Sequence, residues 1–321
     1  MANFRLASVN CGHAGDALCV FSPVAHLSWL EAIVIGGLQG VTELFPVSSL
    51  GHSILLPAVI GGTWAQDLDV SAPESPYLAF VVGLHVATAV ALIIYFWRDW
   101  LRIVRGLATS IVRREVVAAD QRLAWLLVLA TIPVGVSGLL LEHVFRVVLS
   151  KPVPTAAFLA VNGVVLLLGE RLRRRAETLE PDVGSGVAVA ADRRLARLPV
   201  RSAVLIGTAQ VAALLPGISR SGAAMVVGLA KGLSHAEAAR LSFLLATPVI
   251  LAAGALKLGD LAGPLGDGIR PQILVGSLLS GLGAYLSVRF LTRWFETRSM
   301  VPFGIYCLVA GLGCLAWFAL R

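Results

Sequence analysis

Residues 39–52 read QGVTELFPVSSLGH, a polar and glycine-containing interruption inside a long apolar stretch. A second interruption, PGISRSG, spans residues 216–222. Glu43, His52 and Arg220 therefore lie in segments otherwise suited to a bilayer, where ionisable groups are costly and usually line a site or a cavity. Both interruptions contain a proline, which does not continue an ordinary helix. We name them the first break (39–52) and the second break (216–222), and we expect both to be functional.

The composition indicates a polytopic membrane protein. Hydrophobic residues make up 57% of the 321 and charged residues 14%, whereas soluble domains carry about a quarter charged residues. Most apolar segments are near the roughly 20 residues that cross hydrocarbon. They lie at about 28–60, 78–97, 123–142, 155–169, 202–230, 240–257, 272–291 and 302–320. The sequence thus predicts an all-α membrane helical bundle, with residues 1–27 as a variable N-terminal extension and 28–321 as a single membrane domain.

The net charge of +7 resides in short loops and not in one basic domain, which argues against a nucleic-acid partner. By the positive-inside rule the arginine-rich loops at 98–114, 171–197 and 289–298 face the cytoplasm. The acidic loops at 61–77 and 258–269, which lack Lys and Arg, face outward. Counting crossings between these loops requires segment 202–230 to fold back as a re-entrant hairpin, and segment 28–60 is the second re-entrant candidate.

The two broken segments resemble each other. When Pro46 is aligned with Pro216, Ser49 falls on Ser219. An odd number of crossings separates the breaks, so their orientations are opposite, as in inverted repeats whose broken helices meet near the midplane. We expect a first repeat at about 28–170, a cytoplasmic loop at about 171–201 and a second repeat at about 202–321.

The first break carries groups suited to acid–base or nucleophilic chemistry. Gln39 and Glu43 are four residues apart, on one face of the entering helix. Beyond the proline, Ser48 or Ser49 can cap a new helix. Ser49 and His52 are three residues apart in that helix, so both side chains are expected on the same side.

The second break has the composition of an anion site. A helix start with free amides, hydroxyls and an arginine binds anions, and the guanidinium fork suits phosphate. The groups are Gly217, Ser219, Arg220, Ser221 and Gly222. Local alternatives remain for single residues: serines as helix caps, His52 as a packed donor, and Arg220 in a structural ion pair with Glu43. Two roles remain open for His85: an interhelical hydrogen bond, or a position lining a cavity.

At these residues the chain resembles the undecaprenyl-diphosphate phosphatase family, integral-membrane enzymes linked to bacitracin resistance. The resemblance runs from about residue 30 to 320 and includes both breaks, the SFLLATP stretch at 242–248 and the FWRD stretch at 96–99. It implies hydrolysis of the terminal phosphate of undecaprenyl diphosphate, which recycles the lipid carrier for peptidoglycan. It also implies a multi-pass protein of the bacterial inner membrane.

The resemblance assigns catalytic roles to Glu43, Ser49, His52 and Arg220, with either Ser49 or His52 attacking phosphorus. Substrate contacts are expected from Gln39, Ser48, Gly217, Ser219, Ser221 and Gly222. It further implies a divalent cation, Mg²⁺ or Ca²⁺, near Glu43. Many members have Glu where this chain has Gln39, and a neutral carbonyl is a weaker ligand for such cations.

Two matters stay open at the level of sequence. A homodimer is compatible with the chain. The rival function is a lipid or ion transporter, or flippase, because inverted broken helices around a midplane charge are also a transporter arrangement. A transporter needs Arg220 and the helix dipoles, but it needs no nucleophile.

Overall fold

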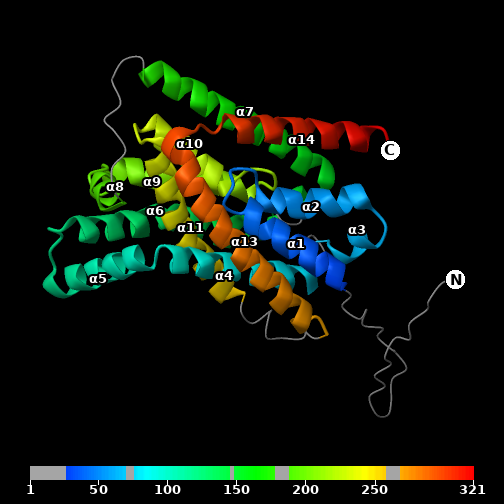
Figure 1. The fold of residues 1–321 in the computed structure, drawn as a ribbon, viewed down its shortest axis with the longest axis horizontal. Coiled ribbons are helices and arrows are strands. Elements are labelled where there is room, and N and C mark those ends of the chain that lie inside the picture. The colour runs from blue at the N-terminus through cyan, green and yellow to red at the C-terminus, as the bar shows by residue number, and fades with distance from the viewer. Residues whose placement is uncertain (1–26, 70–75, 145–147, 178–187, 258–267) are drawn as a thin grey trace, which may run out of the picture.

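A computed structural model describes residues 27–69, 76–144, 148–177, 188–257 and 268–321 (Figure 1). These described residues form helices and no strand, so the predicted all-α class is confirmed. The predicted extension 1–27 lies, except for Leu27, outside the described residues. The elements are α1 (Trp29–Thr42), α2 (Ser49–Ile60), α3 (Thr63–Asp67), α4 (Pro76–Tyr95), α5 (Trp97–Arg113), α6 (Ala119–Val144), α7 (Pro152–Glu177), α8 (Ala188–Leu195), α9 (Val200–Ala209), η2 (Gln210–Leu214), α10 (Arg220–Ala230), α11 (His235–Leu256), α13 (Arg270–Thr297) and α14 (Val301–Ala319).

Six of the described helices are long and apolar enough to cross a membrane, namely α4, α6, α7, α11, α13 and α14. Each coincides with a predicted single crossing, so the expectation of a multi-pass membrane protein is confirmed. The two broken segments form shorter apolar helices instead, α1 with α2 and α9–η2 with α10. Whether these shorter helices are re-entrant stays a prediction.

Long helices lie along one another in pairs. α7 runs beside α14, and α1 runs beside α13, which also packs on α4 (Figure 1). Glycines permit the close approach of α1 and α13, because a Cβ atom added at Gly36 would lie 2.6 Å from the carbonyl oxygen of Gly276. Close backbone contact through small residues is how helices associate without a hydrophobic driving force between them.

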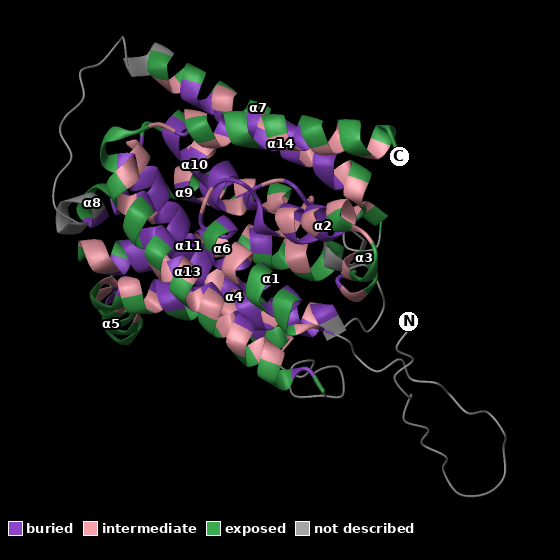
Figure 2. Ribbon diagram, turned by 45° about the vertical axis from the view of Figure 1, so that its right-hand side comes forward, coloured by how far each residue is buried: buried purple, intermediate pink, exposed green. Residues whose placement is uncertain are grey.

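The core lies where α10 and α11 meet the two breaks. Figure 2 shows buried residues concentrated on these central elements and exposed residues on the outer faces of α5 and α14. Phe243, Leu244 and Leu245, within the SFLLATP stretch, are fully buried in α11. The breaks are therefore enclosed by protein, the condition under which non-helical backbone is tolerated at membrane depth.

The arginine-rich segment after α4 differs from its prediction as a loop, because most of it forms helix α5. Ile103, Gly106 and Ser110 are buried, and their spacing of three and four residues defines one helical face. The arginines occupy the remaining faces. The arginines predicted the topology of this segment, but they did not predict the buried helical face that lies between them.

Helix α8, within the predicted cytoplasmic loop, is tied to the bundle by Asp192. This carboxylate is buried and accepts hydrogen bonds from Arg102 of α5 at 2.7 Å and from Arg240 of α11 at 2.7 Å. A buried carboxylate needs such partners, since an unpaired one is strongly destabilising. The network joins three elements that are distant in sequence.

Candidate active site

The two breaks lie in direct contact. α1 ends at Thr42 and α2 begins at Ser49, while η2 ends at Leu214 and α10 begins at Arg220. A Cβ atom added at Gly51 would lie 3.1 Å from Cα of Gly217. The loop carbonyl of Phe45 accepts a hydrogen bond from Ser221 Oγ at 3.3 Å. The glycines thus serve the close approach of two backbones, which a side chain would prevent.

Asn162, buried on α7, joins the breaks to each other. Its Nδ2 donates to the carbonyl of Pro46 at 3.0 Å, and its Oδ1 accepts from the backbone amide of Ser219 at 3.0 Å. One side chain therefore satisfies a loop carbonyl of the first break and a helix-start amide of the second. An asparagine within an apolar helix favours an interhelical hydrogen bond, but the sequence does not name its partner.

Two serines start the helices that leave the site. Ser48 Oγ accepts from the amide of Gly51 at 3.2 Å, and Ser219 Oγ accepts from the amide of Gly222 at 3.2 Å. The expectation that a serine caps the helix after the first break is confirmed for Ser48. Because α2 and α10 both begin here, both present the positive end of a helix dipole to the same place.

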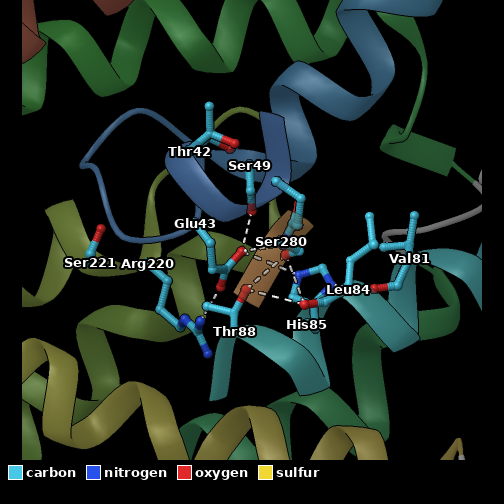
Figure 3. A network of polar contacts seen from close by, with 12 residues as sticks. Thr42, Glu43, Ser49, Val81, Leu84, His85, Thr88, Arg220, Ser221 and Ser280 are labelled. Atoms are coloured by element: carbon cyan, nitrogen blue, oxygen red, sulfur yellow. Dashed lines mark hydrogen bonds and ion pairs between the residues drawn. The ribbon is translucent and has the colours of Figure 1, made fainter. Parts of the chain in front are cut away.

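The side chains of both breaks converge on Glu43. Gln39 Nε2 donates to Glu43 Oε2 at 2.9 Å, Ser49 Oγ donates to the same oxygen, and Arg220 Nη2 donates to Oε1. Figure 3 shows Ser49 and Arg220 pointing toward the carboxylate of Glu43. The side chain of Glu43 is 5% exposed and that of Arg220 is 17% exposed. The structure therefore brings together Gln39, Glu43, Ser49 and Arg220.

A fourth donor reaches Glu43 from outside the breaks. His85 Nε2, on α4, lies 3.3 Å from Glu43 Oε2, and its Nδ1 lies 2.8 Å from the carbonyl of Val81 (Figure 3). The carbonyl of Val81 only accepts, so Nδ1 carries a hydrogen, and the contact of Nε2 with Glu43 is an ion pair when the ring is protonated. The contact joins α4 to the end of α1, which agrees with the interhelical interpretation of His85, and a cavity role stays a prediction. The sequence signal was an imidazole at membrane depth.

His52 is directed elsewhere. Its Nδ1 lies 2.7 Å from the carbonyl of Ser48, and its Nε2 lies 2.7 Å from the hydroxyl of Tyr306 on α14. The two rings stack with centroids 5.7 Å apart. Among the described residues, no hydrogen bond or ion pair joins His52 to Glu43, Ser49 or Arg220. Ser49 and His52 were expected on the same side of the helix, but their side chains bind different partners.

The remaining predicted substrate contacts occupy packing positions. Gly217 has φ +107°, a backbone conformation that favours glycine, and it packs against Thr155 and Leu159 of α7. Gly222 faces Pro46 and Leu166. Ser219 Oγ and Ser221 Oγ lie 3.0 Å apart. Substrate contact by these residues stays a prediction.

The residues around Glu43 do not fit a divalent cation held by the protein alone. Both carboxylate oxygens already have partners, and the partner of Oε1 is the cationic guanidinium of Arg220. No cluster of three or more His, Cys, Asp or Glu suited to a metal occurs in the described part of the chain. Gln39 Oε1 is buried without a hydrogen-bond partner, but it is a single neutral oxygen.

Comparison of the sequence with known proteins identifies the family of this chain. The sequence model described as "Bacitracin resistance protein BacA" matches residues 32–313. The chain belongs to this family. Both breaks, Asn162 and His85 all lie inside the range that the BacA model matches.

Curated relatives align over nearly their whole length. A protein named Undecaprenyl-diphosphatase from Mycolicibacterium paratuberculosis is 61% identical over 303 residues, which cover 92% of this chain and 99% of the relative. The protein of that name from Mycobacterium avium is 60% identical with the same coverage. Undecaprenyl-diphosphatase 1 from Frankia casuarinae is 51% identical, covering 92% of this chain and all of the relative.

Proposed function

We propose that this BacA-family protein hydrolyses undecaprenyl diphosphate to undecaprenyl phosphate and inorganic phosphate. The observation that carries the proposal is the convergence of Ser49 and Arg220 on one buried carboxylate, Glu43, where two helix starts meet. Phosphoryl transfer is catalysed mostly by positioning and electrostatic stabilisation, which this arrangement supplies. The names of the relatives support the same activity.

Arg220 is suited to hold the terminal phosphate without leaving Glu43. Its hydrogen bond to Glu43 uses Nη2, and a guanidinium carries five N–H donors in a fixed fork. The remaining donors, together with the starts of α2 and α10, form a positively polarised surface for phosphate oxygens. This surface would also stabilise the charge that develops on the transferring group.

The contacts of Ser49 support it as the nucleophile. Its hydroxyl already donates to Glu43 Oε2, which is the relation of a nucleophile to its base. In the proposed step Ser49 Oγ bonds to the terminal phosphorus, the hydroxyl proton passes to Glu43, and the bond to the bridging oxygen breaks. Undecaprenyl phosphate leaves, Glu43 returns its proton to solvent, and water hydrolyses the phosphoserine to release phosphate. Attack by His52 would require its imidazole to leave Tyr306.

The cellular role follows from the activity. Hydrolysis regenerates the monophosphate carrier lipid for peptidoglycan synthesis and removes the diphosphate form, in line with bacitracin resistance in the family description. We place the multi-pass protein in the bacterial inner membrane with the arginine-rich segments at 98–114 and 171–197 on the cytoplasmic side. Their arginine content supports this orientation.

The test is phosphate release by purified protein in detergent, with undecaprenyl diphosphate or a soluble inorganic diphosphate as substrate. We expect release from the lipid at a rate at least about tenfold above that from the soluble diphosphate, because the reacting groups lie at membrane depth. A lipid or ion transporter would instead move its cargo across vesicles and release no phosphate. Absence of phosphate release from the lipid would therefore reject the hydrolase.

A further inference from the structure

His85 stands apart from the other groups that contact Glu43. Gln39 and Ser49 belong to the first break and Arg220 to the second. Within the described part of the chain, His85 is the one polar partner of Glu43 that comes from a continuous spanning helix, α4. Gln39 lies one turn before Glu43 on the same helix, so it moves with the carboxylate and does not fix it relative to the bundle.

The turn of α4 that carries His85 is fastened to α13. Ser280 Oγ donates to the carbonyl of Leu84 at 3.1 Å, and Thr88 Oγ1 lies 3.2 Å from Ser280 Oγ (Figure 3). Thr88 and Ser280 are both fully buried. Buried, satisfied networks of this kind hold a segment rigidly.

The imidazole ring is also fixed within its own helix. Nδ1 donates to the carbonyl of Val81 at 2.8 Å, which sets the ring plane and directs Nε2 toward Glu43. The contact of Nε2 is to Oε2, the oxygen that accepts from Ser49. Arg220 holds the other oxygen, Oε1. A carboxylate held at both oxygens from two different elements has a defined plane.

We infer that His85 is a positioning residue that orients Glu43 Oε2 toward the Ser49 hydroxyl. Without the Nε2 contact the carboxylate is held by Arg220, by Gln39 of its own helix and by Ser49, the group it must orient, so Oε2 loses its one contact to a continuous spanning helix. Small displacements of a reacting group lower the rate of the chemical step. The effect is therefore expected on kcat and not on substrate binding. The inference rests on the proposed phosphatase activity.

Three substitutions separate the two ring nitrogens. His85→Gln places an amide N–H near the position of Nε2, His85→Asn places one near the position of Nδ1, and His85→Leu removes both. We expect His85→Gln to keep kcat within about threefold, and His85→Asn and His85→Leu to lower it about 10- to 100-fold, the size of a lost hydrogen bond to a charged group. KM should change by less than about threefold in all three.

Thermal unfolding of each purified variant supplies the structural control, and kcat is referred to the folded fraction. A merely structural role predicts that kcat follows stability, so that the variants with equal unfolding temperatures have equal kcat. His85→Asn retains a polar side chain, so it replaces His85→Leu in the comparison if His85→Leu does not fold. Any order other than wild type and Gln above Asn and Leu would overturn the inference.

A double-substitution cycle tests the route through Glu43. In the Glu43→Gln background, His85→Leu should lower the remaining rate by less than about twofold, since residues that act as a unit are not additive. A full independent loss in that background would show that His85 does not act through Glu43. The two proposals fail separately: an inactive wild type rejects the phosphatase, whereas an active wild type with unchanged His85→Leu rejects only the role of His85.

Discussion

The carboxylate of Glu43 accepts from four side chains that are spread from residue 39 to residue 220. One of these partners, Arg220, is a cation, so its guanidinium offsets the charge of the carboxylate and keeps further donors for a diphosphate. The positive charge of Arg220 disfavours a free metal ion. Gln39 adds an oxygen without adding negative charge. We therefore expect any divalent cation to enter together with the substrate.

Cation binding to the substrate-free protein tests this charge balance. We expect no saturable binding of Ca²⁺ to wild type by equilibrium dialysis, and saturable binding by Gln39→Glu, because a second carboxylate would then face the buried site. Glu43→Gln in the same assay is the control and should bind none. Saturable binding by wild type that disappears in Glu43→Gln would show that the protein alone holds the cation.

Helix termini and crossings were predictable because their causes are local. Capping boxes, which a serine followed three residues later by a glutamate favours, are present at Ser28 with Glu31 and at Ser234 with Glu237, and Ser48 caps α2. The contact of His85 with Glu43 and the bridge made by Asn162 were not predictable. Both depend on which helices lie side by side, and a polar residue in an apolar helix does not specify its partner.

At the level of elements, the packing of α1 on α13 depends on missing side chains. Gly36→Ala would place a methyl group 2.6 Å from the carbonyl oxygen of Gly276 and should lower the free energy of unfolding by about 1–3 kcal/mol. The neighbouring Gly37 has no atom within 4 Å of an added Cβ. Gly37→Ala is therefore the matched control, expected to be neutral or stabilising by up to about 1 kcal/mol.

Thermal and denaturant unfolding in the same detergent measures both changes. Equal destabilisation by Gly36→Ala and Gly37→Ala would contradict close backbone contact between α1 and α13. Unchanged stability in both would contradict it as well.

At the scale of the whole molecule, the packing supports the inferred inverted repeat. α1 packs on α13 and α9 packs on α6, while α13 packs on α4 and α6 packs on α11. If α1, α4 and α6 of the first repeat correspond to α9, α11 and α13 of the second, the α1–α13 contact corresponds to the α9–α6 contact. The α4–α13 contact then corresponds to the α11–α6 contact. The weak sequence similarity of the two breaks predicted the repeat, but it did not predict which helices pack against each other.

Orientation is tested by labelling cysteines in intact cells, in a background without the four native cysteines. Gln66→Cys and Val117→Cys both place the thiol at an exposed position. By the arginine distribution, a membrane-impermeant thiol reagent should label Gln66→Cys in intact cells and Val117→Cys only after lysis. The reverse pattern would invert the assigned topology.

The most direct test of the catalytic centre is the initial rate of phosphate release from undecaprenyl diphosphate by wild type, Ser49→Ala and Ser53→Ala. Ser53 lies one turn further along α2 and is also buried, so its substitution controls for the loss of a buried hydroxyl. We predict that Ser49→Ala lowers the rate at least about 100-fold, as expected for a lost nucleophile, while Ser53→Ala stays within about threefold of wild type. A Ser49→Ala protein that releases phosphate at the wild-type rate would contradict the proposed reaction at the meeting of the two breaks.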